Sequence, residues 1–362
     1  MQQYLQLLRD IKEKGTWKDP ARKNMPRTLS LFGTRMELDM KDGFPLLTTK
    51  KVYFKGIMTE LLWFLKGDTN IKYLVDNGCH IWNQDAYRWY LKKCEEQNIG
   101  RNISFELFVN YIKNSKSYDE LVLDSSKNSV VECPLTPKDY VLGDLGKVYG
   151  HQWRNQNGVD QLVTVIERLI KEPEGRYAIL DAWNPTDFNE MALPPCHILY
   201  QFNCRKIDSY RREDLYARKY NFNDEQRGEM NPNDSDEHVH ILMDEDNIPK
   251  YYLDLQLYQR SCDTFLGVPF NVASGALLLH IISKIVGMEP GKFVWVGGDT
   301  HIYENHLEAV EEQLSRTPTK LPQLHINQFI ECQGLTLLAP EFFKLENYNP
   351  QAKIEAELKT GL

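Results

Sequence analysis

Two apolar helical segments limit most strongly what this chain can fold into. Residues 52–67 (VYFKGIMTELLWFLKG) have helical spacing with apolar side chains on more than one face, and residues 270–287 (FNVASGALLLHIISKIVG) are apolar over most of a long helix. A helix of either kind is stable only when other elements cover it on several sides. We therefore predict that both are central in one core, and a chain of 362 residues with 42% apolar residues is large enough to build it.

The other periodic segments predict strands and helices that do not alternate regularly. Strands are favoured at 29–40, 176–184, 197–205 and 254–261, and amphipathic helices at 3–14 and 158–173. We identify no internal repeat and no linker rich in proline, glycine or serine. The sequence therefore predicts a single α+β domain spanning 1–362.

Two polar stretches interrupt this pattern, and we interpret them as insertions. Residues 91–140 are lysine-rich and weakly periodic, which is typical of an inserted helical or loop segment. Residues 206–250 are acidic and low in apolar content, which favours a surface loop.

Charge and cysteine usage indicate a cytoplasmic enzyme. The net charge of −8 argues against an extended nucleic-acid surface, which needs concentrated lysine and arginine. The charged amphipathic start is unlike a secretory signal, and we identify no apolar run that approaches the roughly 20 residues of a membrane span. Seven cysteines without a C-x-x-C pair fit free thiols in a reducing compartment. We expect neither DNA nor a membrane as a partner.

Signals for a metal or a nucleotide cofactor are weak. His238 and His240 lie in an acidic stretch, but their neighbours lack the spacing of a known metal site. The chain contains no G-x-x-x-x-G-K-[ST] loop and no G-x-G-x-x-G, so neither ATP nor a dinucleotide is indicated. We expect no metal.

A cysteine that follows two prolines is the first candidate for chemistry. In MALPPCHILY (191–200), the prolines remove two backbone donors and fix φ just ahead of Cys196, which precedes a predicted strand. A thiol held in this way becomes a nucleophile if cationic or hydrogen-bonding groups lower its pKa. The alternative for any one cysteine is a small buried hydrophobic residue.

Three further segments carry candidate polar groups. In YQRSCDTFLGVPFN (258–271), Arg260 beside a serine suits a phosphate, and the Asn271 amide can both donate to and accept from a pyrimidine edge, although a strand end with a helix N-cap is the alternative. GGDTHIYENH (297–306) exposes backbone beside His301 and Tyr303, as a plain surface turn would. Glu60 has apolar neighbours in the helix at 52–67, so we predict a buried carboxylate.

Six motifs, in order along the chain, resemble those of the thymidylate synthase family. They are GFPLLTTKK, TELLWFLKGDTNI, GDLGKVYGHQWR, AWNPTDFNEMALPPCH, LYQRSCDTFLGVPFNVAS and GGDTHIYENH. The resemblance implies a large mixed, twisted β-sheet covered by helices, with two subunits meeting sheet to sheet in a cytoplasmic homodimer. It also implies a methyltransferase that converts dUMP to dTMP with 5,10-methylenetetrahydrofolate as donor of carbon and hydride, releasing dihydrofolate.

The resemblance also implies roles for matching residues. Cys196 would add to C6 of the uracil ring, and Glu60 would relay protons through water. The implied catalytic set is Cys196, Glu60, Tyr149, Arg260 and Asp263, with His197 also near the nucleophile. The residues implied at dUMP are Arg22, Arg176 (reaching across the dimer), Arg260, Ser261, Cys262, Asp263, Asn271, His301 and Tyr303. Those implied at the folate are Lys50, Tyr53, Ile81, Trp82, Asp263, Leu266, Gly267 and Phe270.

The sequence departs from the family pattern at positions near the phosphate and the folate. The phosphate arginine is Arg22 if one residue is inserted there, and otherwise the position falls on Lys23. Tyr177 stands where a second arginine is usual, Asp85 replaces a tryptophan, and Tyr53 replaces a histidine. The tail, IEAELKTGL, is unlike the short apolar closure of the family.

Three rival interpretations accompany this hypothesis. A deoxyuridylate hydroxymethylase shares every step up to the exocyclic methylene, and the altered tail and Asp85 would favour it if they admit water. A cytidylate hydroxymethylase fits less well, because Asn271 suits uracil. A catalytically silent dimeric binding module is disfavoured by the intact Cys196, Glu60 and Asn271.

Overall fold

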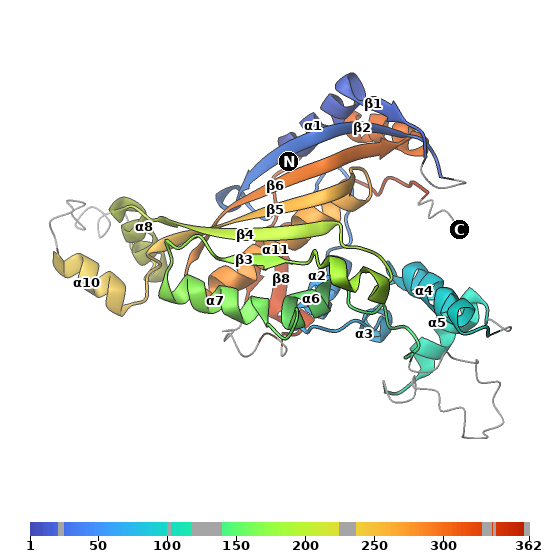
Figure 1. The fold of residues 1–362 in the computed structure, drawn as a ribbon. Helices are drawn as coiled ribbons and strands as arrows, with labels where there is room; N and C mark the ends of the chain where they lie inside the picture. Colours follow the sequence, from blue (N-terminus) through green and yellow to red (C-terminus); the bar gives the residue numbers. More distant parts are fainter. Residues whose placement is uncertain are drawn as a thin grey trace.

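A computed structural model describes residues 1–20, 25–99, 103–117, 140–223, 237–327, 335 and 338–357, and a six-stranded sheet forms its centre (Figure 1). The strands of this sheet are β1 (Thr16–Lys18), β2 (Thr28–Asp39), β3 (Ile179–Asp181), β4 (His197–Lys206), β5 (Tyr251–Asp263) and β6 (Glu289–Tyr303). Their order is β1-β2-β6-β5-β4-β3, with one parallel pair, β5–β6, among antiparallel neighbours. The predicted mixed sheet is therefore confirmed.

Helices and a small second sheet complete the α+β fold. The α-helices are α1 (Gln2–Lys14), α2 (Phe54–Leu65), α3 (Lys72–Asp76), α4 (Asn83–Glu96), α5 (Phe105–Asn114), α6 (Tyr149–Asn155), α7 (Gln161–Lys171), α8 (Ser209–Lys219), α10 (Glu237–Glu245), α11 (Gly267–Val286) and α12 (Leu307–Ser315). Short 3₁₀ turns are η1 (Met40–Asp42), η3 (Pro185–Glu190), η4 (Glu304–His306) and η6 (Pro340–Phe342). The second sheet pairs β7 (Gln323–Ile326) with β8 (Phe343–Glu346).

The core lies between the central sheet and α11. Leu255 and Leu257 on β5, and Phe293 and Trp295 on β6, alternate with less buried residues and are fully buried, as expected for the covered face of a sheet. Gly275 lets α11 approach closely, because a Cβ at this position would lie 2.4 Å from the Phe293 ring. The central placement predicted for 270–287 is confirmed.

Helix α11 also corrects one expectation from the sequence. It is 20 residues long and apolar enough to cross a membrane, so the prediction that no apolar segment approaches this length is wrong. However, 72% of its most apolar stretch is buried inside the protein. Its apolar character is therefore explained by its position as the core helix.

One segment expected to be a surface loop is helical, and one for which a surface turn was the alternative is a strand. The acidic stretch 206–250 carries α8 and α10 instead of a surface loop, and Arg212 joins them by donating to the Asp244 carboxylate at 2.7 Å. The Gly-Gly-Asp motif continues β6 instead of forming a surface turn. His238 and His240 lie on α10, but their side chains, like residues 118–139 of the first insertion, are outside the described part.

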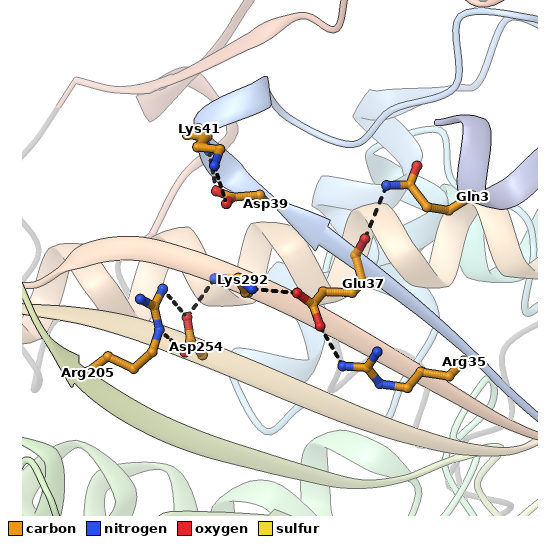
Figure 2. Close-up of polar contacts among 8 residues, drawn as sticks. All are labelled: Gln3, Arg35, Glu37, Asp39, Lys41, Arg205, Asp254 and Lys292. Atoms are coloured by element: carbon orange, nitrogen blue, oxygen red, sulfur yellow. Dashed lines mark hydrogen bonds and ion pairs between the residues drawn. The ribbon is translucent and has the colours of Figure 1, made fainter.

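The second face of the sheet bears a row of paired charges across four strands (Figure 2). Glu37 on β2 accepts from Arg35 and from Lys292 on β6, at 2.5 Å each. Asp254 on β5 accepts from the Lys292 backbone at 2.7 Å and from two nitrogens of Arg205 on β4. Each carboxylate therefore has a cationic partner in a face that is only partly covered.

Candidate active site

Backbone contacts hold the Cys196 loop at the start of β4. The Cys196 N–H donates to the Tyr149 hydroxyl at 2.6 Å, and its carbonyl accepts from the Arg260 N–H at 2.9 Å. The Arg260 guanidinium donates to the carbonyls of Pro194 and Pro195, at 2.8 Å each. The two prolines thus offer their carbonyls to the same arginine that approaches the thiol.

Burial favours the neutral form of the Cys196 thiol, and a nearby cation acts against this effect. Burial raises the pKa of Cys196, while the Arg260 charge lowers this pKa and the Asp85 charge raises it. Asp85 lies in the first turn of α4 and pairs with Arg88. The nucleophile predicted from the Pro-Pro-Cys pattern therefore has its cationic neighbour, and the departure at position 85 acts on the thiol directly.

Glu60 is buried on α2, with 8% of its surface exposed. The Trp82 indole donates to its Oε1 at 2.7 Å. Burial raises the pKa of Glu60 to about 7, and the bond from Trp82 acts in the opposite direction. A carboxyl group with this pKa can both give and take a proton near neutral pH.

A chain of hydrogen bonds orients Asn271, the fifth residue of α11. Trp295 donates to Gln259 Oε1 at 2.9 Å, and Gln259 Nε2 donates to Asn271 Oδ1 at 3.0 Å. The Asn271 Oδ1 is thereby assigned as the acceptor of this bond. His197, whose pKa burial lowers to about 4, is also hydrogen-bonded to Asn271.

The turn between β5 and α11 is fixed by Asp263. Its Oδ1 accepts from the Phe265 and Leu266 N–H groups at 3.1 Å each, which satisfies backbone donors at the start of α11. From outside the turn, Tyr4 donates to the Thr264 carbonyl at 3.0 Å, and Lys50 donates to the Phe265 carbonyl at 2.6 Å. Burial lowers the pKa of Lys50 to about 7.

The end of β6 presents His301 and Tyr303 beside this turn. Their ring centroids are 5.1 Å apart, and the His301 carbonyl accepts from the Thr264 N–H at 2.9 Å. Asp299 is close to His301 Nδ1, at 3.4 Å, and the pKa of this carboxyl is held far below its usual range by His301 first, and also by Lys18.

A cavity of about 830 Å³ opens next to the turn. Four residues predicted at the folate line it, namely Lys50, Tyr53, Leu266 and Phe270. Gly267 begins α11 beside them, Trp82 reaches Glu60 instead, and Ile81 is exposed. The far wall is the C-terminal segment 353–356, so the cavity is bounded by residues from both ends of the chain.

Three predicted residues are not brought to the site by this chain. Arg22, like its alternative Lys23, lies outside the described residues. Cys262 is fully buried, so its thiol is turned away from the side of β5 that bears Ser261 and Asp263. Arg176 is exposed before β3, and the pairing Ile179↔Gln201 directs it toward the end of β4 opposite Cys196.

Sequence reasoning missed the residues that orient the candidate groups. Gln259 had a detectable signal, because it occupies the inward position that follows Leu253, Leu255 and Leu257 on β5. A polar side chain at such a position must have a partner. Tyr4 had no such signal, because its contact at Thr264 spans 260 residues of sequence.

Comparison with known proteins places this site in a family. A family model described as thymidylate synthase matches residues 2–360. A thymidylate synthase of Mycoplasma mobile is 43% identical over 331 residues, which cover 91% of each chain. Those of Phytoplasma mali and Listeria monocytogenes are 38% and 36% identical, over 96% and 99% of each chain.

Proposed function

Because the chain belongs to the thymidylate synthase family, it is a methyltransferase that forms dTMP from dUMP, and we propose that Cys196 is its nucleophile. The observation that carries this assignment is the clamp on the Cys196 loop: Tyr149 on one side and Arg260 on the other fix the backbone that bears the thiol. The relatives named above are all thymidylate synthases, so the hydroxymethylase alternative has no support.

Cys196 adds to C6 of uracil as a thiolate. The C–S bond forms with the sulfur electron pair, and the ring electrons move to C5 and the O4 carbonyl, which makes C5 the carbon nucleophile. Arg260 supports this step, because its charge lowers the pKa of the thiol. The guanidinium gives two of its donors to proline carbonyls, so its remaining N–H groups are those that face an anionic phosphate.

Glu60 and Asn271 act on the uracil ring. Glu60, with a pKa of about 7, exchanges protons with the O4 side of the ring through water. Asn271 pairs with the uracil edge, and its orientation through Gln259 and Trp295 selects the base. His301 and Tyr303 hold the deoxyribose hydroxyl.

The cavity beside the turn suits 5,10-methylenetetrahydrofolate as the second substrate, with Asp263 at its pterin. Phe270 and Tyr53 offer aromatic surface for flat rings, and Lys50 and Lys353 offer positive charge for the glutamate carboxylates. When bound, this substrate supplies the one-carbon unit and the hydride. Metal is not part of the proposal.

Arg176 argues for a homodimer. The register of β3 on β4 puts it about eight residues along β4 from Cys196, roughly 25 Å at the rise of a strand, so it cannot serve the site of its own chain. Phe32 on β2 is 82% exposed and Tyr177 is 75% exposed, so both offer apolar surface that a second subunit would bury. We propose that the sheet of a partner subunit covers these side chains in a sheet-to-sheet dimer. In this dimer Arg176 reaches the phosphate site of the partner.

The charge row on this face is compatible with burial between subunits. Its charged groups already have partners within the chain, so covering them leaves no unpaired charge. A cytoplasmic location, without DNA or membrane partners, fits the five free thiols of the described residues.

One incubation tests the proposed function. The protein is mixed with dUMP and 5,10-methylenetetrahydrofolate, and the nucleotide product is analysed by mass spectrometry. We expect a methyl group on C5 together with one dihydrofolate per dTMP. A hydroxymethyl product, or unchanged dUMP under conditions in which a relative is active, would refute the proposal.

A further inference from the structure

The C-terminal segment is tied down at several points where it crosses the folate cavity. Gln351 donates to the Thr48 carbonyl at 2.8 Å, and Arg316 donates to the Ala352 carbonyl at 2.5 Å. Residues 353–356 then form a wall of the cavity. Ile354 in this wall is buried in the core, at 5% exposed, and the next contact that holds the segment is at Glu357.

We propose that His306 is a positioning residue that, with Asn305, latches the C-terminal segment over the folate cavity. Asn305 Nδ2 and His306 Nε2 both donate to the Glu357 carbonyl, at 3.1 and 2.9 Å. A carbonyl only accepts, so Nε2 carries the ring proton. The Nδ1 atom is buried and has no hydrogen-bond partner among the described residues, which leaves the tail as the bond of this ring.

The His306 ring packs against one residue proposed to bind dUMP and one residue of the turn beside the folate cavity. His306 is 1% exposed, and its ring packs edge-on against Tyr303 with the ring centroids 5.5 Å apart. Tyr303 in turn contacts His301. The His306 ring also packs against Phe265, with the ring centroids 5.7 Å apart. Phe265 belongs to the turn that Asp263 fixes. These two ring contacts fix the orientation of the imidazole that holds the tail.

This inference rests on the proposed function, since it assigns the cavity to the folate. The latch holds residues 353–356 as a wall of the folate cavity. The residues proposed to bind dUMP do not belong to this segment. Loss of the latch should therefore weaken folate binding selectively, because an open tail costs entropy when it must close over the ligand. A purely structural role of His306 would instead disturb both substrates.

Three variants and one control test the latch. His306→Leu removes the donor at similar volume, His306→Gln keeps an N–H in the place of Nε2, and Asn305→Ala removes the exposed half of the fork without disturbing the core. His325→Leu, on β7 and paired with Glu346, is the control. Hydrogen exchange of the tail amides 351–357 is measured without ligand, and KM and Kd are measured for each substrate.

We expect His306→Leu to speed tail exchange and to raise the KM for methylenetetrahydrofolate about tenfold, the effect of one lost buried hydrogen bond. The Kd for dUMP should stay within about twofold, His306→Gln should restore both readouts, and Asn305→Ala should lie between. Unchanged tail exchange in His306→Leu, or a glutamine variant as impaired as the leucine variant, would overturn the latch. If the wild type forms no dTMP, the proposed function fails, and the exchange data still decide whether His306 holds the tail.

Discussion

Arg260 acts on the proposed nucleophile Cys196 in two ways, and together they explain why this position needs an arginine. Its guanidinium holds the carbonyls of Pro194 and Pro195, and its charge opposes the effect of burial on the pKa of Cys196. A lysine would supply the charge without the planar pair of donors. Position and activation of the thiol are thus coupled through a single side chain.

Replacement of the nucleophile should abolish turnover but not nucleotide binding. Cys196→Ser should lower kcat by about 10³-fold or more, because a hydroxyl near neutral pH is a far poorer nucleophile than a thiolate. The Kd for dUMP, measured by calorimetry, should change little. Cys262→Ala is the matched control, since this thiol points into the core. Near-normal kcat in Cys196→Ser would exclude the assignment.

Removal of the Asp85 charge should activate the thiol. Because this carboxylate raises the pKa of Cys196, Asp85→Asn should lower that pKa and enlarge the thiolate fraction at pH 7. Alkylation of Cys196 by iodoacetamide, followed by peptide mass mapping, should be about threefold faster. Asp76→Asn on α3, where the carboxylate pairs with Lys72, serves as the control. An equal or slower rate in Asp85→Asn would contradict this electrostatic role.

Asn271 should determine the base. Asn271→Asp keeps an oxygen for Gln259 but loses the N–H donor, so it can accept from the amino group of cytosine and cannot donate to the uracil carbonyl. The ratio of kcat/KM for dCMP to that for dUMP should rise about a hundredfold. Asn110→Asp, the same change on the exposed side of α5, should leave this ratio unaltered. Equal ratios in Asn271→Asp and wild type would exclude the role.

Residue chemistry was predictable where a local pattern carried it. Pro-Pro-Cys pointed to Cys196, whose role as nucleophile stays a prediction, and an acid among apolar residues pointed to a buried Glu60, whose burial the structure confirms. The partners were not predictable, because Trp82 lies 22 residues and Trp295 lies 36 residues from the groups they contact. Only the fold brings such donors together.

At the scale of elements, α2 gives up stability to carry Glu60. Apart from Thr59, the other buried side chains of this helix are apolar, whereas the Glu60 carboxylate is desolvated and receives a bond from Trp82. A helix designed for stability alone would have an apolar side chain here. A costly buried charge of this kind is typical of an active site.

The cost of Glu60 should appear as a pH dependence of stability. Its pKa is near 4.5 when unfolded and about 7 when folded, so the folded state disfavours ionisation, and stability is lost as pH rises from 4.5 to 7. Glu60→Gln removes this loss, which is on the order of 3 kcal/mol. Its melting temperature should exceed that of the wild type more at pH 8 than at pH 5, while kcat falls. Glu167→Gln, exposed on α7, should show no such divergence, and parallel pH curves for Glu60→Gln and wild type would disprove the argument.

Helices and strands with a clear apolar spacing could be predicted from the sequence. A strand was missed where its glycines resemble those of a turn. Helices α2 and α11 and strands β2, β4 and β5 lie where the apolar spacing placed them. Strand β6 (Glu289–Tyr303) was not predicted at all, and Gly297 and Gly298 suggested a turn near its end, yet a Cβ on Gly297 would lie 2.4 Å from the Trp295 side chain. Glycine is required there by close packing inside a strand.

At the scale of the molecule, the helices and the charge row give the sheet two different faces. One face packs on α11, and the other carries Arg35, Glu37, Lys292, Asp254 and Arg205 as paired charges. The charges of this row are therefore already paired within one subunit, so covering the row would leave none of them without a partner. A sheet of this kind could be predicted from the family resemblance, but not from spacing alone, because strand order depends on contacts between distant segments.

A mixing experiment should show whether Arg176 acts across the dimer. Cys196→Ser protomers lack the nucleophile, and Arg176→Glu protomers place a negative charge at the phosphate, so each variant alone should be inactive. In a mixed dimer, the intact Cys196 of one chain meets the intact Arg176 of the other, which restores one site. Random re-assortment of equal amounts makes half of the dimers mixed, so about a quarter of wild-type activity should return. Cys196→Ser mixed with a Cys196→Ala protomer is the matched control, because no pairing of these chains contains a nucleophile. Re-equilibrated dimers of the first pair that stay as inactive as this control would mean that Arg176 does not act across the interface, and the distance imposed by the β3–β4 register would then exclude it from the phosphate site altogether.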